Sequence, residues 1–334
     1  MMKSQAIVFT GPEQVELVEL EVKEPSPGEL LLRTLVSQVS TGTELICFRG
    51  ECDPDTHWAE FMAPPLYPGY SAVGEVVAVG EGVTGFGVGD RVSSIHKHQQ
   101  YATVPADSIC SHPLPDDISD EQAAWGPLAF ITQTGVRHAE HVLGDAAVVI
   151  GLGPLGQLTV QYLRLMGLWE ILAIDTDQWR LDMALQHGAT QGFLGDVGDA
   201  KQFVAEHTKG RLADVVYDVT GHYSVLPKAL PLARDFGKVI LLGDSPHPSK
   251  QQLTDDILNR QVKLLGTRSS WLPPQYAYWT RVQQMELFLT YLRRGQMQVD
   301  DLVTHKIAPD EALELYPRLL ADRSGTMGIL YDWR

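Results

Sequence analysis

The residues most clearly spaced for chemistry lie in the stretch 148–158, which reads Val-Val-Ile-Gly-Leu-Gly-Pro-Leu-Gly-Gln-Leu. Apolar residues lead into the pattern G-x-G-x-x-G, and a helical pattern follows through Met166. In such a strand–turn–helix the first glycine permits the turn, the second lets a pyrophosphate approach the backbone, and the third lets helix and strand pack closely. The helix start also offers free N–H groups to phosphate. We therefore predict a dinucleotide site that contains Gly151, Gly153, Pro154, Leu155 and Gly156.

An acidic residue follows this pattern at the distance that dinucleotide binding requires. A second predicted strand, residues 170–174, ends in Asp175, where an acid accepts hydrogen bonds from the ribose hydroxyls. A carboxylate there repels a 2′-phosphate, so the sequence favours NAD over NADP as the cofactor. The alternative is that Asp175 only caps the following turn through Asp177.

Two further loops are candidates for the nicotinamide half of the site. Residues 219–221 and 242–244 follow later predicted strands, and ligands of doubly wound sheets lie outside the carboxyl ends of the strands. Thr220 and Gly243 are therefore predicted cofactor contacts. Either loop could equally be a plain turn.

The elements that position these residues alternate between strand and helix from about residue 120 to residue 265. Such alternation predicts a parallel sheet that is covered on both faces. The strands are expected at residues 146–150, 171–174, 215–219, 238–242 and 262–265. The first part of the chain differs, because its strands at residues 29–36 and 72–79 are separated by glycine-rich turns.

Composition and charge restrict the class of protein. The chain of 334 residues is long enough for two domains, and its net charge of -16 argues against nucleic acid as a partner. We see neither a signal peptide nor an apolar run near the roughly 18 residues of a membrane span. Three cysteines without a C-x-x-C pair are typical of reduced thiols, so we expect a cytoplasmic protein.

The order of motifs resembles that of the medium-chain dehydrogenase/reductase superfamily along the whole chain. The motifs are Pro68-Gly69, Gly74-Glu75-Val76, Val79-Gly80, Gly89-Asp90-Arg91-Val92, Gly151–Gly156, Asp175 and Gly188-Ala189. The resemblance implies an α/β protein with a GroES-like β-rich catalytic domain at residues 1–122 and 267–334. It also implies a Rossmann doubly wound parallel-sheet domain at residues 123–266, an active site in the cleft between the domains, and a homodimer formed through the sheet edge at residues 262–265.

The departures from the zinc-containing members are as informative as the agreements. Those members have Cys-Gly-Thr-Asp where this chain has Thr41-Gly42-Thr43-Glu44, and Gly-His-Glu where it has Gly69-Tyr70-Ser71. Their third ligand, often a Glu before Pro, falls at Gly126-Pro127, and the four-cysteine structural lobe is missing. A zinc site needs three ligands of Cys, His or carboxylate type. We therefore expect no metal.

A narrower likeness concerns the bacteriochlorophyllide dehydrogenase branch of the superfamily. It is carried by Ser40–Glu44, Pro68-Gly69-Tyr70, Leu302–His305 and Ile329–Trp333. These matches are short, so they indicate a branch and not a substrate.

Without a metal, side chains must handle the proton of an alcohol. The resemblance places Thr43 at the hydroxyl relay of the zinc members and Tyr70 at a former metal ligand; the alternatives are a helix cap and a space-filling ring. His96 and His98 lie two apart and would share one face of an extended segment, where imidazoles could exchange protons near neutral pH. Glu44 is expected to act as a positioning carboxylate.

These expectations together describe a zinc-independent NAD-dependent oxidoreductase that interconverts a secondary alcohol and a ketone. A quinone or enoyl reductase that uses NAD(P)H, or a non-catalytic NAD-binding protein, are the alternatives. The substrate is expected to be a small molecule, and a cyclitol, a sugar, a polyol and a hydroxyethyl tetrapyrrole all remain open.

Overall fold

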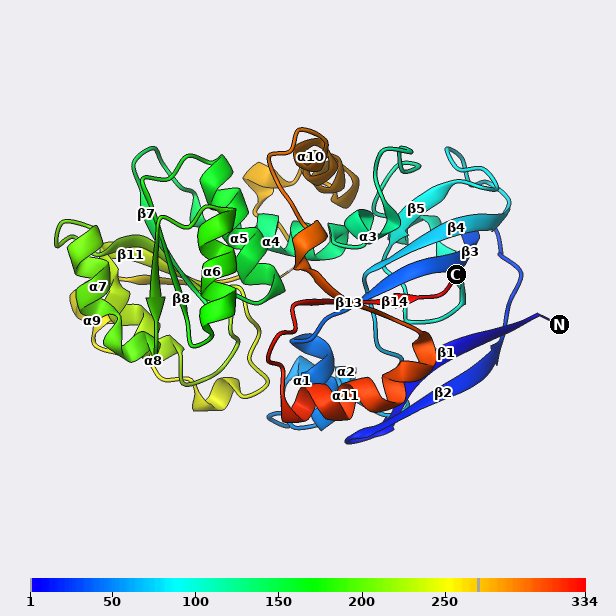
Figure 1. Cartoon of the computed structure of the whole chain (residues 1–334), viewed down its shortest axis with the longest axis horizontal. Helices are drawn as coiled ribbons and strands as arrows, with labels where there is room; N and C mark the ends of the chain where they lie inside the picture. Colours follow the sequence, from blue (N-terminus) through cyan, green and yellow to red (C-terminus); the bar gives the residue numbers. More distant parts are fainter. Residues whose placement is uncertain (1, 269–270) are drawn as a thin grey trace. The chain divides into compact units, whose positions relative to one another are not determined.

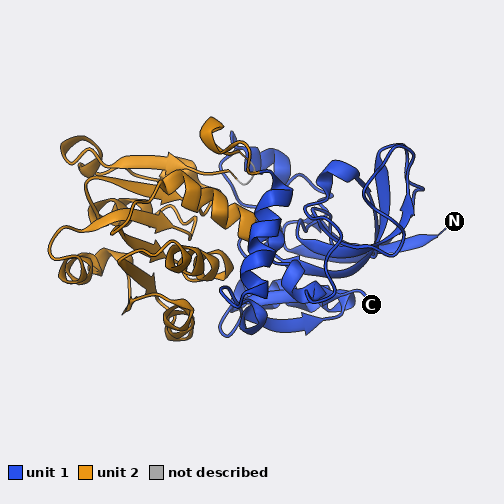
Figure 2. Ribbon diagram, turned by 90° about the horizontal axis from the view of Figure 1, so that it is seen from above, with its two compact units in different colours: residues 1–128, 280–334 blue, residues 129–279 orange. Residues whose placement is uncertain are grey.

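The computed structural model describes residues 2–268 and 271–334, and the chain divides into two compact units. Unit 1 comprises Met1–Leu128 and Thr280–Arg334, and unit 2 comprises Ala129–Trp279 (Figure 2). The boundaries expected from the sequence, after residues 122 and 266, lie earlier in the chain. The first division falls inside helix α4 (Gly126–Ala139), and the second falls just before helix α10 (Arg281–Arg293).

Unit 1 is built around a six-stranded sheet and a separate hairpin. The order of the sheet is β13-β14-β3-β4-β5, and β6 also pairs with β3. Its strands are β3 (Glu29–Val39), β4 (Ala72–Val79), β5 (Arg91–Ser94), β6 (Tyr101–Pro105), β13 (Val303–Ile307) and β14 (Gly328–Asp332). The hairpin consists of β1 (Lys3–Gly11) and β2 (Gln14–Glu21). The remaining helices of unit 1 are α1 (Thr43–Arg49), α2 (His57–Phe61), α3 (Asp120–Ala123) and α11 (Ala312–Ala321) (Figure 1).

The long central strand β3 carries the chain directly into the candidate site. Ten of its eleven residues are buried or half-buried, and the strand continues to Val39, three residues beyond the predicted end. Helix α1 follows after a short turn and buries Phe48 against Phe9 and Tyr316, which form an aromatic cluster with α11. This cluster fixes α1 beside the end of β3.

Unit 2 is a parallel sheet in the order β12-β11-β10-β7-β8-β9. The strands are β7 (Ala146–Ile150), β8 (Glu170–Asp175), β9 (Gln191–Leu194), β10 (Ala213–Asp218), β11 (Ala233–Leu241) and β12 (Lys263–Gly266). The helices that follow α4 are α5 (Pro154–Leu165), α6 (Gln178–His187), α7 (Lys201–His207), α8 (Leu226–Ala229) and α9 (Asp256–Asn259). This architecture confirms the predicted α/β fold class, with a β-rich unit and a doubly wound parallel sheet.

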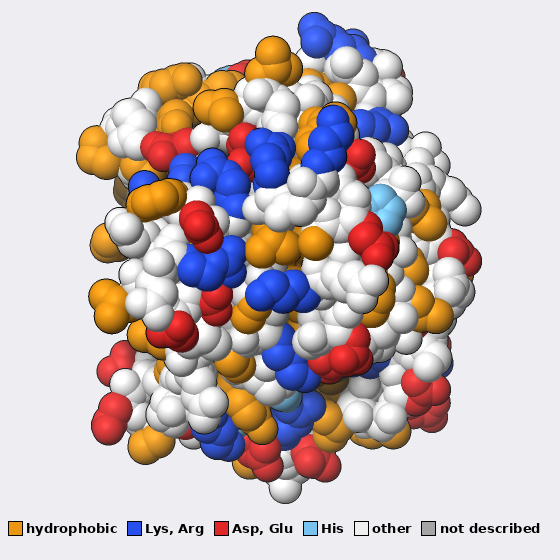
Figure 3. Space-filling model, turned by 90° about the vertical axis from the view of Figure 1, so that its left-hand side faces the viewer, with side chains coloured by type: hydrophobic (Ala, Val, Ile, Leu, Met, Phe, Trp, Pro, Cys, Tyr) orange, Lys and Arg blue, Asp and Glu red, His pale blue; other side chains and the backbone are white. Residues whose placement is uncertain are grey.

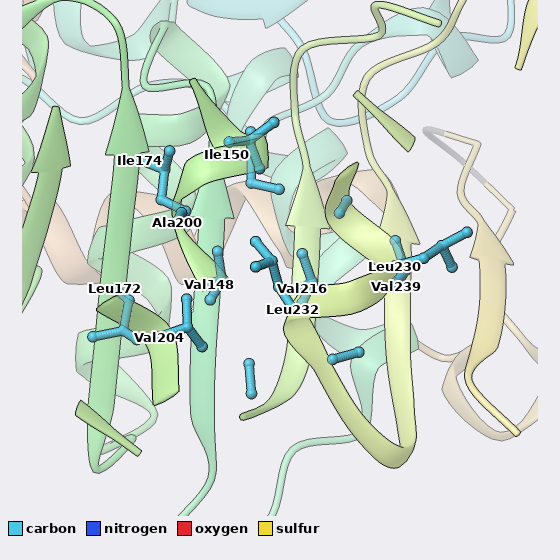
Figure 4. Close-up of a cluster of buried hydrophobic side chains, with 14 of the residues drawn as sticks. Val148, Ile150, Leu172, Ile174, Ala200, Val204, Val216, Leu230, Leu232 and Val239 are labelled. Atoms are coloured by element: carbon cyan, nitrogen blue, oxygen red, sulfur yellow. The ribbon is translucent and has the colours of Figure 1, made fainter. Parts of the chain in front are cut away.

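The parallel strands are apolar because helices cover both faces of the sheet. On one face, Val148 and Val216 pack with Val204 of α7 in a buried apolar cluster (Figure 4). Leu226 of α8 belongs to the same cluster. Helices α5 and α6 pack against β7, β8 and β9. The core therefore holds the carboxyl ends of β7, β8, β10 and β11 at one edge of the sheet.

Strands β6, β9 and β13 were not predicted, because they are short and lack a continuous apolar pattern. β9, for example, lies at a sheet edge, and all four of its residues are half-buried or exposed. None of the described helices is both long enough and apolar enough to cross a membrane. On the face drawn in Figure 3, basic, acidic and hydrophobic side chains are intermixed.

Candidate active site

The glycine-rich turn of unit 2 has the geometry that its sequence predicts. Gly151 has a φ of 89°, which an L side chain rarely adopts. A Cβ atom at Gly156 would lie 2.1 Å from the carbonyl oxygen of Gly151, so only glycine lets α5 pack this closely on the turn. Helix α5 begins at Pro154, and its N-cap Gly153 makes no side-chain cap. The first turn of α5, with Leu155, therefore stays open for a phosphate group.

Asp175, the last residue of β8, is tied to this turn. Its Oδ2 accepts a hydrogen bond of 2.7 Å from the backbone N–H of Leu152, and its Oδ1 accepts one of 2.9 Å from Asp177. Asp177 in turn caps α6 by accepting from the N–H of Trp179. Asp175 thus fixes the local turn, as the alternative interpretation expected, and also places a carboxylate beside the glycine loop.

At the carboxyl edge of the sheet, the loop 219–221 meets the glycine turn, and the loop 242–244 meets the loop 219–221. A Cβ atom at Gly151 would lie 2.7 Å from Cγ2 of Thr220, and one at Gly243 would lie 2.3 Å from the backbone nitrogen of Gly221. The predicted contacts Thr220 and Gly243 are therefore brought close to the loop. The chemistry and the close backbone packing of these residues fit a bound dinucleotide.

Asp218 is a residue of this edge that the sequence analysis missed. Its Oδ1 accepts hydrogen bonds from the backbone N–H and the hydroxyl of Thr220, at 3.0 and 2.6 Å. Burial raises the pKa of Asp218 to about 6, although hydrogen bonds from Thr220 and Gly221 oppose the shift. The sequence does carry a signal that could have identified Asp218, because it is an acid at the end of an apolar strand and stands two residues before a threonine.

In unit 1, three hydroxyl groups gather where β3 ends and α1 begins. The Oγ of Ser40 lies 2.6 Å from the phenolic oxygen of Tyr70, which is half-buried. Burial raises the pKa of Tyr70, and hydrogen bonds with Ser40 and Thr43 partly oppose this effect. Thr43 is the first residue of α1, whereas the N-cap is Gly42, so the interpretation of Thr43 as a helix cap is wrong.

Glu44 is buried beneath this cluster and is held by three donors. Its carboxylate accepts from the backbone N–H of Ser40 (2.8 Å), from the hydroxyl of Tyr316 (2.6 Å) and from Nε2 of His98 (3.1 Å). Burial acts to raise the pKa of Glu44, but the charge and the hydrogen bond of His98, together with the other two donors, lower it overall. His98 is also buried, and its Nδ1 lies 2.8 Å from Oγ of Ser37.

The structure gives His96 and His98 different partners, which corrects the expectation that they act together. The Nε2 of His96 lies 3.0 Å from Oγ1 of Thr34, and its Nδ1 lies 2.5 Å from Oγ of Ser94. Burial lowers the pKa of His96 to about 3, with a further contribution from His98. His96 is thus a neutral core histidine, and the expectation that it exchanges protons near neutral pH does not hold.

The donors in unit 1 do not fit a catalytic zinc ion. Thr41 and Tyr70 offer a hydroxyl and a high-pKa phenol, whereas zinc sites use thiolate, imidazole or carboxylate. Across residues 2–268 and 271–334, no group of three or more His, Cys, Asp or Glu side chains lies close enough to hold a metal ion. Glu44 and His98 are near each other but are already engaged by Tyr316, Ser40 and Ser37.

This fold and this glycine loop define a two-domain dehydrogenase that uses a nicotinamide dinucleotide. Residues 26–116 match the family described as "Alcohol dehydrogenase GroES-like domain", and residues 154–281 match "Zinc-binding dehydrogenase". The chain belongs to the medium-chain dehydrogenase/reductase superfamily, among its alcohol dehydrogenase-like members, and it is an NAD(P)-dependent oxidoreductase.

Named relatives agree with this assignment, and a solved structure shares the fold. The chain is 27% identical over 299 residues to the L-threonine 3-dehydrogenase of Bacillus licheniformis, covering 78% of this chain and 82% of that one. It is 28% identical over 324 residues to the sorbitol dehydrogenase of Halalkalibacterium halodurans, with coverages of 87% and 89%. The structure of a putative zinc-binding dehydrogenase from Sinorhizobium meliloti, bound to NADP, shares the fold with a TM-score of 0.81, 23% identity, and coverages of 99% and 100%.

Proposed function

We propose that the protein interconverts a secondary alcohol and a ketone with NAD as the cofactor and without zinc. The observation that carries this proposal is the hydrogen bond between Ser40 and Tyr70 beside Thr43, at positions where the donor set does not suit a metal. The printed names of the threonine and sorbitol dehydrogenases support alcohol oxidation as the type of reaction.

Unit 2 would hold the cofactor through the turn 151–156, Asp175, Thr220 and Gly243. When bound, the cofactor accepts or donates the hydride. The carboxylate of Asp175 favours a free ribose hydroxyl over a 2′-phosphate, because like charges repel. Both of its oxygens already accept a backbone N–H, so this carboxylate is held in place beside the loop.

Tyr70 would supply the proton and the hydrogen bond at the substrate oxygen. Its raised pKa keeps the phenol protonated at neutral pH, so it can donate to a carbonyl oxygen and stabilise the alkoxide that develops there. Ser40 and Thr43 would orient the phenol and relay its proton. In reduction, the proton that Tyr70 gives to the substrate oxygen would be replaced from solvent through these hydroxyls, and in oxidation the alcohol proton would leave to solvent along the same path. Together these hydroxyls replace part of the polarisation that a metal ion provides in other enzymes.

Glu44 and His98 would act one step further from the substrate. Glu44 accepts from the backbone N–H of Ser40 and so fixes the residue that contacts Tyr70. His98 holds Glu44 in turn and is fully buried, so we assign it a positioning role instead of the direct proton exchange expected from its type.

The likeness to the bacteriochlorophyllide dehydrogenase branch is part of this proposal only as a subgroup. The motifs that carry this likeness, Ser40–Glu44 and Pro68–Tyr70, contain the residues of the hydroxyl cluster. The likeness therefore concerns residues to which we assign a role in the reaction. From this likeness we propose no substrate class narrower than secondary alcohols.

The test combines metal analysis with a turnover panel. Purified protein should contain no stoichiometric zinc, and it should reduce NAD with at least one of sorbitol, L-threonine, 2,3-butanediol and a cyclitol. Activity should survive treatment with a chelator. Stoichiometric zinc lost together with activity, or turnover of enones and quinones alone with NADPH, would contradict the proposal.

A further inference from the structure

Lys97 lies in the segment that packs against Gly69, the residue before Tyr70, and has no role in the reaction described above. Its backbone is fixed there, because the N–H of His98 donates to the carbonyl of Pro68 at 2.9 Å and the N–H of Ile7 donates to the carbonyl of His98 at 3.0 Å. The His98 backbone and ring are also so close to Gly69 that a Cβ at Gly69 would lie 2.7 Å from the His98 nitrogen. Lys97 is therefore held next to the residue that precedes Tyr70.

The Lys97 ammonium group is half-buried and lies 5.9 Å from the centre of the Phe61 ring on α2. In the part of the chain that the structure describes, it forms no ion pair with a carboxylate. Burial lowers the pKa of Lys97, while the charges of Glu44 and Cys47 act in the opposite direction. A cation removed from water in this way needs a compensating negative group.

The two acidic neighbours do not provide that group. Glu44 already accepts hydrogen bonds from His98, Tyr316 and Ser40. Burial raises the pKa of the Cys47 thiol to about 12, so Cys47 is neutral at physiological pH. The charge of Lys97 is therefore only partly balanced by the protein.

A second donor near the same aromatic ring is also without an acceptor. The indole Nε1 of Trp58 is buried, and among the described residues it has no hydrogen-bond partner. Trp58 and Phe61 belong to the same short helix, with ring centres 6.1 Å apart. Buried polar groups are nearly always satisfied, so this N–H is available to donate to a ligand oxygen.

We propose that Lys97, assisted by the N–H of Trp58, binds an anionic group of the substrate, a carboxylate or a phosphate. The inference rests on the proposed function, since it assumes that the same substrate presents its alcohol or carbonyl oxygen to Tyr70. Lysine is a common point-charge ligand of both groups. The substrate is thus a hydroxy compound that carries a negative charge, and a neutral polyol is a poor substitute for it.

Binding is tested first, without turnover. Thermal shift and isothermal titration with inorganic phosphate and with acetate, at matched ionic strength in chloride, are compared for the wild type, Lys97→Met, Lys97→Arg, Trp58→Phe and Lys23→Met. Lys23 is an exposed lysine of the same unit and serves as the matched control. Lys97→Met should weaken binding of at least one probe by about tenfold, Trp58→Phe by a smaller factor, and Lys97→Arg and Lys23→Met little.

Turnover then identifies the anion. The matched pairs are sorbitol 6-phosphate with sorbitol, and L-threonine with L-threoninol. The member that carries the phosphate or carboxylate should be preferred in one of the pairs, and Lys97→Met should raise its KM by about tenfold while leaving kcat and the KM of the partner that lacks this group nearly unchanged.

The outcomes separate the two proposals. Loss of anion binding in Lys97→Met without turnover of any alcohol would support the anion site and contradict the proposed function. Anion binding that is equal in the wild type and in Lys97→Met, or absent from both, would overturn the inference even if alcohols are oxidised.

Discussion

At the scale of single residues, the chemistry of this protein depends on how burial and partners change ordinary side chains. His96 and His98 lie two residues apart, yet they have different roles. His96 lies between Thr34 and Ser94, whereas His98 contacts the carboxylate of Glu44. The phenol of Tyr70 acquires a raised pKa and a hydroxyl partner at 2.6 Å. The environment of each group therefore decides its role.

The first residue-scale prediction concerns Tyr70. Tyr70→Phe keeps the ring and removes the hydroxyl, so it should lower kcat by at least about tenfold, at the low end of the range for general acid–base groups. The affinity for NAD should stay nearly unchanged. Single-turnover rates at several pH values measure the effect, and Tyr67→Phe, a nearby tyrosine outside the hydroxyl cluster, is the control. Equal rates in the wild type and Tyr70→Phe would place the proton path elsewhere, with Glu44 the next residue to test.

The second concerns the buried pair of Glu44 and His98. Removing one partner of a buried hydrogen bond leaves the other group unsatisfied, which typically costs about 1–3 kcal/mol and more when that group is charged. Glu44→Gln and His98→Gln should each lower the free energy of unfolding strongly, whereas the double variant should lose much less than the sum of the two. Denaturant titration of the four proteins measures this coupling. Additive losses would mean that the two groups do not interact.

At the scale of elements, the ends of strands carry the functional groups, and a few hydrogen bonds hold neighbouring ends in register. Asp175 links the end of β8 to the turn after β7, and Glu44 links the first turn of α1 to the end of β3. His96 links the segment after β5 to Thr34 in the middle of β3. Each link joins segments that are distant in sequence or belong to different elements.

The link made by Asp175 predicts the cofactor preference. Asp175→Ser removes the negative charge, so it should weaken NAD binding and reduce the discrimination against NADP. Asp175→Asn keeps a carbonyl oxygen that can accept a backbone N–H, so it separates loss of charge from loss of the turn. Isothermal titration with both cofactors provides the measurement. Equal affinity of the wild type for NAD and NADP would show that the ribose assignment is incorrect.

The link made by His96 predicts how stability depends on pH. The pKa of His96 is lowered to about 3 in the folded protein, against about 6.5 in an unfolded chain. Between these values the unfolded chain binds a proton that the folded protein does not, so stability falls as the pH drops from about 6.5 toward 3, by up to about 1.4 kcal/mol per pH unit from this group.

Replacement of His96 by glutamine should therefore flatten the pH dependence of the unfolding free energy in this window. His141, whose pKa burial also lowers, would contribute to the part that remains, as would Glu121 and Asp332, whose pKa values are lowered to about 2 by their partners. Denaturant unfolding at a series of pH values makes the comparison. An unchanged slope in His96→Gln would show that His96 takes up protons equally in both states.

At the scale of the whole molecule, the parallel sheet of unit 2 ends at β12, an edge strand. An edge strand presents unpaired N–H and C=O groups, which suit pairing with a second copy. Because the resemblance to the superfamily implies pairing at β12, we predict a homodimer through this edge, and Leu265→Lys should shift it toward monomer by placing a charge on β12. Light scattering after size exclusion, over a range of concentrations, checks the prediction. A wild-type monomer at all concentrations would refute it.

Local sequence patterns were enough to predict the parts of this protein that depend on a few neighbouring residues. The apolar run 146–150 and the glycines at 151, 153 and 156 were sufficient to predict strand, turn and helix, because each glycine is required by a close approach within a few residues. The same holds for β4, whose predicted and observed bounds, residues 72–79, agree. The order of the motifs and of the predicted strands and helices along the chain then indicated the superfamily and the α/β architecture.

The contacts between polar residues could not be predicted in this way, because they depend on how distant segments pack. The hydroxyl of Ser40 contacts Tyr70 thirty residues away, and Glu44 meets His98 and Tyr316 across separations of 54 and 272 residues. No local pattern encodes such pairs, because they arise when β3, the segment after β5, and α11 are packed together. Protonation follows from the same packing, since burial and partners set the pKa values of His96, Asp218 and Lys97. Residue type alone left these roles open.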